Sequence, residues 1–438
     1  MRCVLQHLGV LAACLVGAAA TTAQTPPQGP PPPGVARVLI DRRLQEHAVR
    51  ITALDARTLT YTDSAGLVRS EPLAEFIAIL PDHAATSDSA AGGALPGFLP
   101  VGAASAQELT LADGQRLVGR FGSVLGDAPA EVFTWEHPVL GPLEVRLDDV
   151  RRLQLGFAEP ALLAPGGPRQ PGDTDLVILA NGDRLEGFVE GLLREGPAVR
   201  LVTGETARDI PFERIGHIHF QSNPAGAPPE GSLIAWLRDG SILACRALRT
   251  TRAGELTIEL AMREGAPARP AEATMAQGAL ALADLVAADL RPGLLTPLAS
   301  LPPAEQRPAA ERRWSPPVTA SQNNAPLHLE DLHLPGPLAV EWDLPPGASR
   351  FAATAELPRS MWDWGDAEVV VALAAQGRET ELFRQRLSAE RPAAAINLSL
   401  ERAPAGARLR IRLEAGPYGA VQDRIVLRRP VLLRNSEQ

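Results

Sequence analysis

The sequence predicts an all-β protein in which several small β modules precede an antiparallel β-sandwich. Three observations lead to this prediction. Short apolar runs recur, each followed by an Asp-Gly or Asn-Gly turn. From about Leu327 onward, apolar and polar residues alternate strictly in longer runs. Stretches rich in Pro and Gly separate the units, and such segments bury too little apolar surface to fold on their own.

The first 23 residues have the features of a secretory signal peptide. Arg2 precedes an apolar run from Val4 to Ala20, and small residues follow up to Ala23, where we expect cleavage. The sequence therefore predicts an exported protein of the periplasm, cell surface or medium. A competing interpretation treats Leu11 to Cys14 as a lipoprotein box with a lipid on Cys14, but the apolar run continues past that cysteine. No later stretch is long and apolar enough to predict a transmembrane helix.

The net charge argues against a nucleic-acid or anionic-membrane partner, and the cysteine content argues against a disulfide in the mature chain. The net charge is −9, and all 42 basic residues are arginine. Nucleic acids and anionic membranes require a concentrated positive surface, so we expect no nucleic-acid partner. Of three cysteines, Cys3 and Cys14 lie in the signal, which leaves Cys245 alone. No disulfide within the mature chain is then expected, and packed cores must supply the stability.

The Pro/Gly-rich stretches divide the mature chain into five units. A Pro-rich linker is expected at residues 24–34 and a longer linker at 292–325. Between them lie four predicted β modules, at residues 35–82, 107–158, 175–221 and 231–291, and a β-sandwich is predicted at residues 326–435. The fourth module is expected to contain an insertion around Arg263 to Gln277.

The four modules are variants of one pattern. Three of them open with an apolar strand that runs into Asp113-Gly114, Asn181-Gly182 or Asp239-Gly240, dipeptides that suit the positive φ angles of a two-residue hairpin turn. All four close on spaced apolar residues, and these closing segments are Glu75 to Leu80, Asp149 to Leu155, Arg214 to Phe220 and Asp284 to Leu290. About five short strands per module are therefore expected.

This pattern resembles the small SH3-like or Sm-like barrel in strand order and turn placement. The predicted fold is thus all-β, with tandem SH3-like/Sm-like β-barrel repeats followed by an antiparallel, jelly-roll-like sandwich. The resemblance covers most of residues 35–291. RNA binding, which Sm barrels perform, is not expected of an exported acidic chain. An alternative that stays open is that the four modules are hairpins of one larger β domain.

The C-terminal unit predicts a β-sandwich of about seven strands. In Arg408 to Leu413, three arginines face one side and Leu409, Ile411 and Leu413 face the other, as a half-buried antiparallel strand requires. Similar alternation recurs in the other strands of this unit, which supports a sandwich.

At these residues the chain resembles the NPCBM group, a carbohydrate-binding module noted beside some glycoside hydrolases and common in exported planctomycete proteins. The landmarks are Phe351 to Ala353, Val369 to Leu373, the Leu-Arg-Ile-Arg-Leu strand, and Asp423 before a last strand that ends at Leu433. The resemblance implies a β-sandwich and sugar binding. Two positions depart from the pattern: Ile425 to Arg428 hold no tryptophan, and Glu356-Leu357 replaces a usual glycine.

The candidate sugar-binding residues are Trp362, Asp363, Trp364 and Asp366, together with the landmark Asp423. If the Trp-Asp-Trp segment is extended, both indoles lie on one face, where they can stack on a sugar ring while carboxylates accept hydroxyl protons. The alternative interpretation is that one or both indoles cap the sandwich core.

No catalytic or metal-binding signature is present in the sequence. His217 and His219 share one strand face near Glu213, but no third ligand is identifiable, so we interpret them as polar, outward-facing residues. Nucleophile elbows, phosphate-binding loops and metalloprotease motifs are absent. We therefore expect no cofactor, no metal and no enzyme activity.

Two hypotheses for function remain. In the first, an exported non-catalytic protein binds a polysaccharide or glycan through the sandwich while the repeats serve as spacers. In the second, the chain is a structural or protein-interaction scaffold of the cell envelope without sugar binding, and its partners are envelope proteins. A role as accessory protein to a glycoside hydrolase is a third, less favoured interpretation.

Overall fold

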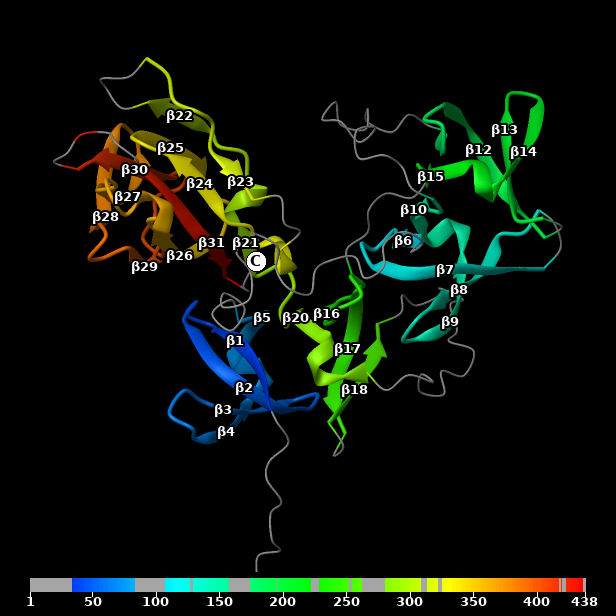
Figure 1. The fold of residues 1–438 in the computed structure, drawn as a ribbon, viewed down its shortest axis with the longest axis horizontal. Helices are drawn as coiled ribbons and strands as arrows, with labels where there is room; N and C mark the ends of the chain where they lie inside the picture. Colours follow the sequence, from blue (N-terminus) through cyan, green and yellow to red (C-terminus); the bar gives the residue numbers. More distant parts are fainter. Residues whose placement is uncertain are drawn as a thin grey trace, which may run out of the picture.

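The computed structural model describes residues 34–82, 107–126, 129–156, 174–194, 196–221, 228–251, 254–261, 280–308, 313–321, 325–416, 419 and 423–435. The described residues form strands joined by turns and short 3-10 turns, which confirms the all-β prediction (Figure 1). The predicted signal peptide and the predicted insertion at residues 263–277 lie outside the described residues.

Each of the four N-terminal modules contains five strands with a 3-10 turn before the last. Module 1 consists of β1 (Val35–Asp41), β2 (Glu46–Leu54), β3 (Thr58–Thr62), β4 (Val68–Pro72), η1 (Leu73–Glu75) and β5 (Phe76–Pro81). Module 2 consists of β6 (Gln107–Leu111), β7 (Arg116–Leu125), β8 (Val132–His137), β9 (Gly141–Arg146), η3 (Leu147–Asp149) and β10 (Val150–Gln154). Module 3 consists of β11 (Asp175–Leu179), β12 (Arg184–Leu193), β13 (Ala198–Thr203), β14 (Thr206–Pro211), η5 (Phe212–Arg214) and β15 (Ile215–His219). Module 4 consists of β16 (Leu233–Leu237), β17 (Ile242–Thr250), β18 (Glu255–Leu260), β19 (Leu280–Ala281), η6 (Leu282–Asp284) and β20 (Leu285–Asp289).

The strand pairing is the same in all four modules. The first four strands pair consecutively and antiparallel, and the fifth pairs with the first, as in module 1 where β5 pairs with β1. The turn glycines Gly114, Gly182 and Gly240 have φ angles of 87°, 89° and 94°, which glycine adopts without steric cost. In every module the long second strand shifts register partway along its pairing with the third strand, and such bulges bend a strand sharply.

The modules associate as two pairs through their fifth strands. In one pair β5 of module 1 is hydrogen-bonded to β20 of module 4, and in the other β10 of module 2 is hydrogen-bonded to β15 of module 3. A contact between Ile242 and Arg116 joins modules 4 and 2. One continuous hydrophobic core runs through all four modules. Each module thus has its own complete strand order, while the cores merge.

Two sheets form the C-terminal sandwich. The first sheet has the order β23-β24-β31-β26-β29 with β21 also on β31, and the second has the order β22-β25-β30-β27-β28. The strands are β21 (Leu295–Pro297), β22 (Glu305–Pro308), β23 (Thr319–Ala320), β24 (Leu332–Pro335), β25 (Leu338–Asp343), β26 (Ala348–Glu356), β27 (Ala367–Ala375), β28 (Arg378–Leu387), β29 (Ala393–Ser399), β30 (Arg408–Ala415) and β31 (Arg424–Arg434).

The inner faces of both sheets enclose one core that is separate from that of the modules. Leu409, Ile411 and Leu413 are buried in it, as their alternation predicts. The arginines of the same strand β30 lie on the outer face among carboxylates, where Arg410 Nε donates to Glu341 Oε1 at 2.8 Å.

The stretch at residues 292–325 is not only a linker, contrary to the sequence-based prediction. β21 pairs with β31, β22 pairs with β25, and β23 pairs with β24. These strands are short and contain few apolar residues, so the sequence pattern does not reveal them. Edge strands obtain most of their stability from backbone pairing with a partner strand.

The sandwich packs against the pair formed by modules 1 and 4 (Figure 1). Leu327, Leu329 and Val431 of the sandwich are buried together with apolar residues of β1, β5, β16 and β20. Polar contacts surround this apolar patch: Arg429 Nη2 lies 2.6 Å from Glu46 Oε2, and Asn397 Nδ2 donates to the carbonyl oxygen of Arg43 at 2.9 Å. A small hydrophobic core with a polar rim therefore fixes the sandwich to this module pair.

Asp289 at the end of β20 should make the stability of this region depend on pH. Burial raises the pKa of Asp289 to about 6 from 3.8, although the backbone N–H of Arg291 donates to its carboxylate at 3.0 Å. A raised pKa means that the neutral acid is favoured in the folded state, so the contribution is complete below about pH 4 and is lost as pH rises through 6. A difference of about two pKa units corresponds to about 3 kcal/mol as an upper bound.

Asp289→Asn should therefore be more stable than the parent at pH 7, by up to about 3 kcal/mol, and nearly equal to it at pH 4. Urea unfolding at pH 4, 5, 6 and 7 measures this difference. Asp63→Asn is the contrasting variant, because a hydrogen bond from Arg69 lowers the pKa of that exposed aspartate. A parent and an Asp289→Asn variant with parallel pH profiles would contradict the prediction.

Candidate functional site

The Trp-Asp-Trp segment forms a turn in the structure and is not extended. It follows the 3-10 turn η9 (Arg359–Met361), and the backbone N–H of Gly365 donates to the carbonyl oxygen of Met361 at 2.6 Å. Trp362 has helical φ and ψ angles of −64° and −27°. The condition for placing both indoles on one strand face is thus not met, and a tight turn places them at the surface instead.

Both indoles are solvent-exposed, which argues against the alternative that they cap the core. Trp364 is 65% exposed and Trp362 is 37% exposed. Trp362 is fixed in position because its Nε1–H donates to the carbonyl oxygen of Leu357 at 3.0 Å and the Arg359 guanidinium lies 5.7 Å from its ring centre. By contrast, Trp135, Trp236 and Trp342 are buried and serve the cores. An exposed, oriented indole is a typical feature of a binding surface.

Asp366 is buried beneath this turn and has a structural role. Its carboxylate forms a two-pronged ion pair with the guanidinium of Arg386, with Nε of Arg386 2.6 Å from Oδ1. Its carbonyl oxygen accepts a hydrogen bond from the backbone N–H of Gly416 at 2.7 Å. Asp366 therefore holds the neighbouring strands in register, and the prediction that it accepts protons from sugar hydroxyls is not supported by its placement.

Trp362, Asp363, Trp364 and Asp366 line one hollow of about 650 Å³. The opposite wall comes from the end of β28 and the turn that follows it, and consists of Gln385, Arg386, Ser388, Ala389, Glu390 and Arg391. Ser388 and Arg391 close that turn through mutual backbone hydrogen bonds of 3.1 Å. No sequence motif marks this wall, because only the pairing of β27 with β28 brings it to the tryptophans.

The hollow combines apolar ring surface with polar groups of both kinds. Asp363 and Glu390 supply carboxylate acceptors, whereas Gln385 and Arg391 supply N–H donors. Such a mixture suits a ligand that has one weakly polar face and hydroxyl groups around its rim.

Asp423 does not line this hollow. Its side chain is buried at the start of β31, where Asp423 is 3% exposed, and its carbonyl oxygen accepts a hydrogen bond from the backbone N–H of Gly336 at 3.0 Å. The placement of Asp423 corrects the sequence-based prediction that it binds sugar. The burial of Asp423 and its contact with Gly336 instead give it a role in positioning the last strand.

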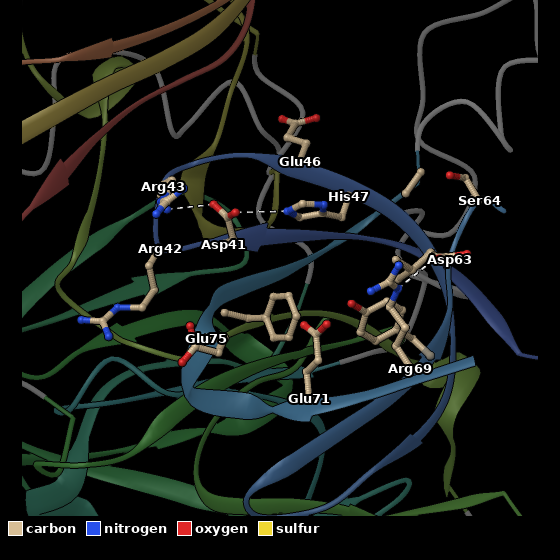
Figure 2. A pocket seen from close by; sticks show the side chains of 14 residues that line it. Asp41, Arg42, Arg43, Glu46, His47, Asp63, Ser64, Arg69, Glu71 and Glu75 are labelled. Atoms are coloured by element: carbon tan, nitrogen blue, oxygen red, sulfur yellow. Dashed lines mark hydrogen bonds and ion pairs between the residues drawn. The ribbon is translucent and has the colours of Figure 1, made fainter. Parts of the chain in front are cut away.

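A second hollow, of about 680 Å³, lies on module 1 and is lined mainly by charged residues (Figure 2). Its groups largely satisfy one another: Asp41 Oδ2 lies 3.1 Å from His47 Nε2, and Asp63 Oδ2 lies 2.8 Å from Arg69 Nε (Figure 2). Tyr61 and Phe76 also line it but are buried, at 6% and 3% exposed. Without an exposed ring, this hollow offers no stacking surface for a sugar.

A third hollow, of about 690 Å³, lies on the sandwich beyond the far end of β27. It is lined by Arg378, Thr380, Glu401 and Arg402 among others, and no aromatic side chain contributes to its lining. The hollow at Trp362 and Trp364 is thus the one among these three that presents exposed aromatic rings.

His217 and His219 lie on one face of β15, as their spacing predicts, with ring centres 6.3 Å apart. His217 is not exposed to solvent, however, because it is only 2% exposed although it lies on the side of the sheet away from the module core. Burial first, and then the charges of Arg152 and His219, lower the pKa of His217 to about 4. Within the described ranges, no three His, Cys, Asp or Glu side chains gather into a group that could hold a metal ion.

Among the described residues, no helix has the length and apolar character needed to cross a membrane.

No family model matches the chain, and no curated protein matches it. Its structural neighbours include carbohydrate-binding modules. The CBM51-2 and INT domains of ZmpB from Clostridium perfringens match with a TM-score of 0.26 and 10% identity over 33% of this chain and 32% of that chain. The chain thus spans about a third of the length of that structure.

Two further structures belong to the same kind of module. The CBM51 of a Clostridium perfringens GH95 protein, in complex with methyl-galactose, matches with a TM-score of 0.25 and 7% identity over 32% of this chain and 99% of that one. The tandem CBM51 modules of the family 98 glycoside hydrolase Sp3GH98 from Streptococcus pneumoniae match with a TM-score of 0.26 and 12% identity. This match covers 60% of this chain and 71% of that one.

Proposed function

We propose that this chain is an exported, non-catalytic protein that binds a neutral carbohydrate in the hollow formed by Trp362, Trp364 and the turn after β28. The observation that carries the proposal is the exposure of two neighbouring indoles in a hollow whose other lining groups are polar. Leaving a large aromatic side chain in water forgoes the free energy of its burial, which a sugar ring stacked on it would recover.

The geometry also supports a division of roles. The Trp364 indole provides the stacking surface, and Trp362 provides a second, more fixed edge because Leu357 and Arg359 hold its ring. Asp363, Glu390, Gln385 and Arg391 exchange hydrogen bonds with hydroxyl groups around the ring. The buried pair of Asp366 and Arg386 positions both walls.

Trp364→Ala should weaken binding of the full chain to its polysaccharide by roughly 30-fold, because an aromatic side chain at the centre of an interface contributes about 2 kcal/mol. Trp362→Ala should weaken it as well. A glycan array and polysaccharide pull-down identify the ligand, and titration calorimetry measures the affinity. The melting temperature of Trp364→Ala should stay within error of the parent, since this indole is mostly exposed.

Trp314→Ala is the matched control, because Trp314 is 71% exposed but does not line the hollow. Binding that is equally weakened in Trp314→Ala, or unchanged in Trp364→Ala, would exclude this site. A chain that binds no glycan at all would favour the envelope scaffold as its role.

A further inference from the structure

The two module pairs differ in the side chains that lie along the seam between their fifth strands, on the side away from the module core. In the pair of modules 1 and 4, the fifth strands carry Ala78, Leu80 and Ala287 on the side of the sheet away from the module core. The sandwich covers this side and buries these residues. Trp236 on the neighbouring β16 belongs to the same covered patch. The seam between these two modules is therefore an apolar docking surface that the chain itself occupies.

In the pair of modules 2 and 3, the equivalent positions are polar. Arg152 pairs with His219 and Gln154 pairs with His217, so these four side chains share the side away from the core. The intervening Leu153 and Ile218 point the other way and are buried. Figure 1 shows modules 2 and 3 apart from the sandwich, which packs against modules 1 and 4.

Two buried donors at this seam have no acceptor among the residues that the structure describes. Arg152 Nη2 donates to His217 Nδ1 at 3.2 Å, so Nδ1 carries no proton and the ring proton lies on Nε2. His217 Nε2 and Arg152 Nε are both buried, and neither has a hydrogen-bond partner in the described part of the chain. A buried donor without an acceptor is costly, so each of these atoms favours an oxygen acceptor.

The charges at the seam favour a negatively charged oxygen. Arg152 and Arg151 are both cationic. Burial lowers the pKa of His219, and the charges of Arg152 and then Arg151 lower it further. Carboxylates on this side include Glu108 of β6, which lies 4.0 Å from Arg116 Nη1, and Glu186 of β12, which is opposite Leu176 of β11. Oxyanions accept several N–H bonds at once and neutralise the charge of arginine.

We propose that the seam between β10 and β15 is a second binding site, which holds a sulfate or carboxylate group between Arg152 and His217. Arg152 Nε and His217 Nε2 donate to the oxyanion, and the half-buried His219 lies at its open side. An anionic saccharide and a free small anion share this chemistry. The site is independent of the sugar hollow on the sandwich.

Titration calorimetry of the full chain with sulfate, galacturonate and neutral galactose tests this proposal. Sulfate should bind, and Arg152→Gln should weaken its binding at least tenfold, whereas Arg208→Gln, an exposed arginine on β14 of module 3, should not. Trp364→Ala should bind sulfate as well as the parent does, which separates this site from the sugar hollow. Galacturonate binding above that of galactose would identify an anionic saccharide as the source, and sulfate binding alone would identify a free anion.

The imidazole signals of the eight histidines provide a readout that loss of folding cannot imitate. Saturating sulfate should raise the pKa of His217, assigned by its absence in His217→Asn, and sulfate affinity should rise as pH falls from 7 to 5. Arg152→Lys keeps the charge but loses the Nε donor, so it should bind sulfate at an intermediate level. An unchanged His217 pKa, or equal sulfate binding in Arg152→Gln and Arg208→Gln, would overturn the proposal.

Discussion

Leu329→Asp should release the sandwich from the pair of modules 1 and 4. Leu329 is 3% exposed, lies just after the short 3-10 turn η8 (Pro326–His328) and belongs to the apolar patch at that junction. A carboxylate buried there without a partner costs about 3–5 kcal/mol, which exceeds what the rim contacts at Glu46 and Asn397 contribute. Because Leu329 lies outside the sheets, both parts should keep their own folds.

The measurement is differential scanning calorimetry of the full chain, in which the variant should show a separate, earlier transition. Limited proteolysis near residue 325 should also become faster. Leu67→Asp is the matched control, because Leu67 is 58% exposed and the same substitution there buries no charge. If Leu329→Asp and Leu67→Asp unfold alike, the junction is not a stabilising interface.

Gly416→Ala should disrupt the sugar hollow although Gly416 itself does not line it. A Cβ atom at Gly416 would lie 2.1 Å from the carbonyl oxygen of Asp366 and 2.7 Å from its Cγ. Both distances are far shorter than van der Waals contact, so the backbone hydrogen bond between these residues must break. The loss of that bond and the overpacking together should lower stability by about 3 kcal/mol.

Displacing Asp366 should also displace Arg386, which pairs with it and lines the hollow, so glycan affinity should fall by about tenfold or more. Chemical denaturation and titration calorimetry measure the two effects. Gly216→Ala is the control, because its added Cβ would meet Ile178 O at an ordinary 3.4 Å. A Gly416→Ala variant with parental stability would show that the loop after β30 moves aside freely.

Local sequence signals were sufficient for most of the strands of this fold, but not for three short edge strands. The glycine turns at Gly114, Gly182 and Gly240 marked hairpins because few other residues adopt their positive φ. The alternation at Arg408 to Leu413 marked a half-buried strand because side chains in a strand point to opposite faces. The edge strands β21, β22 and β23 escaped prediction, since their stability comes from pairing with distant partners.

The candidate site was only half visible in the sequence. The two tryptophans attracted attention because aromatic residues are 4% of the chain. Their exposure, however, depends on the turn after η9, and the second wall depends on the pairing of β27 with β28. Asp366 and Asp423 looked like binding carboxylates, yet packing buried both, because nothing local distinguishes an aspartate that binds a ligand from one that holds two strands together.

The sequence by itself determined that the chain is all-β, that one module pattern occurs four times, and that a sandwich with two neighbouring tryptophans follows. Periodicity and turn chemistry act between near neighbours, so they can be read without a structure. Only the tertiary structure decided how the modules pair, which seam the sandwich covers, and that the other seam brings Arg152 and His217 together. Those outcomes depend on contacts between residues far apart in the chain. The partner strand determines whether a polar side chain faces water, faces a neighbouring domain or is buried without a hydrogen-bond partner.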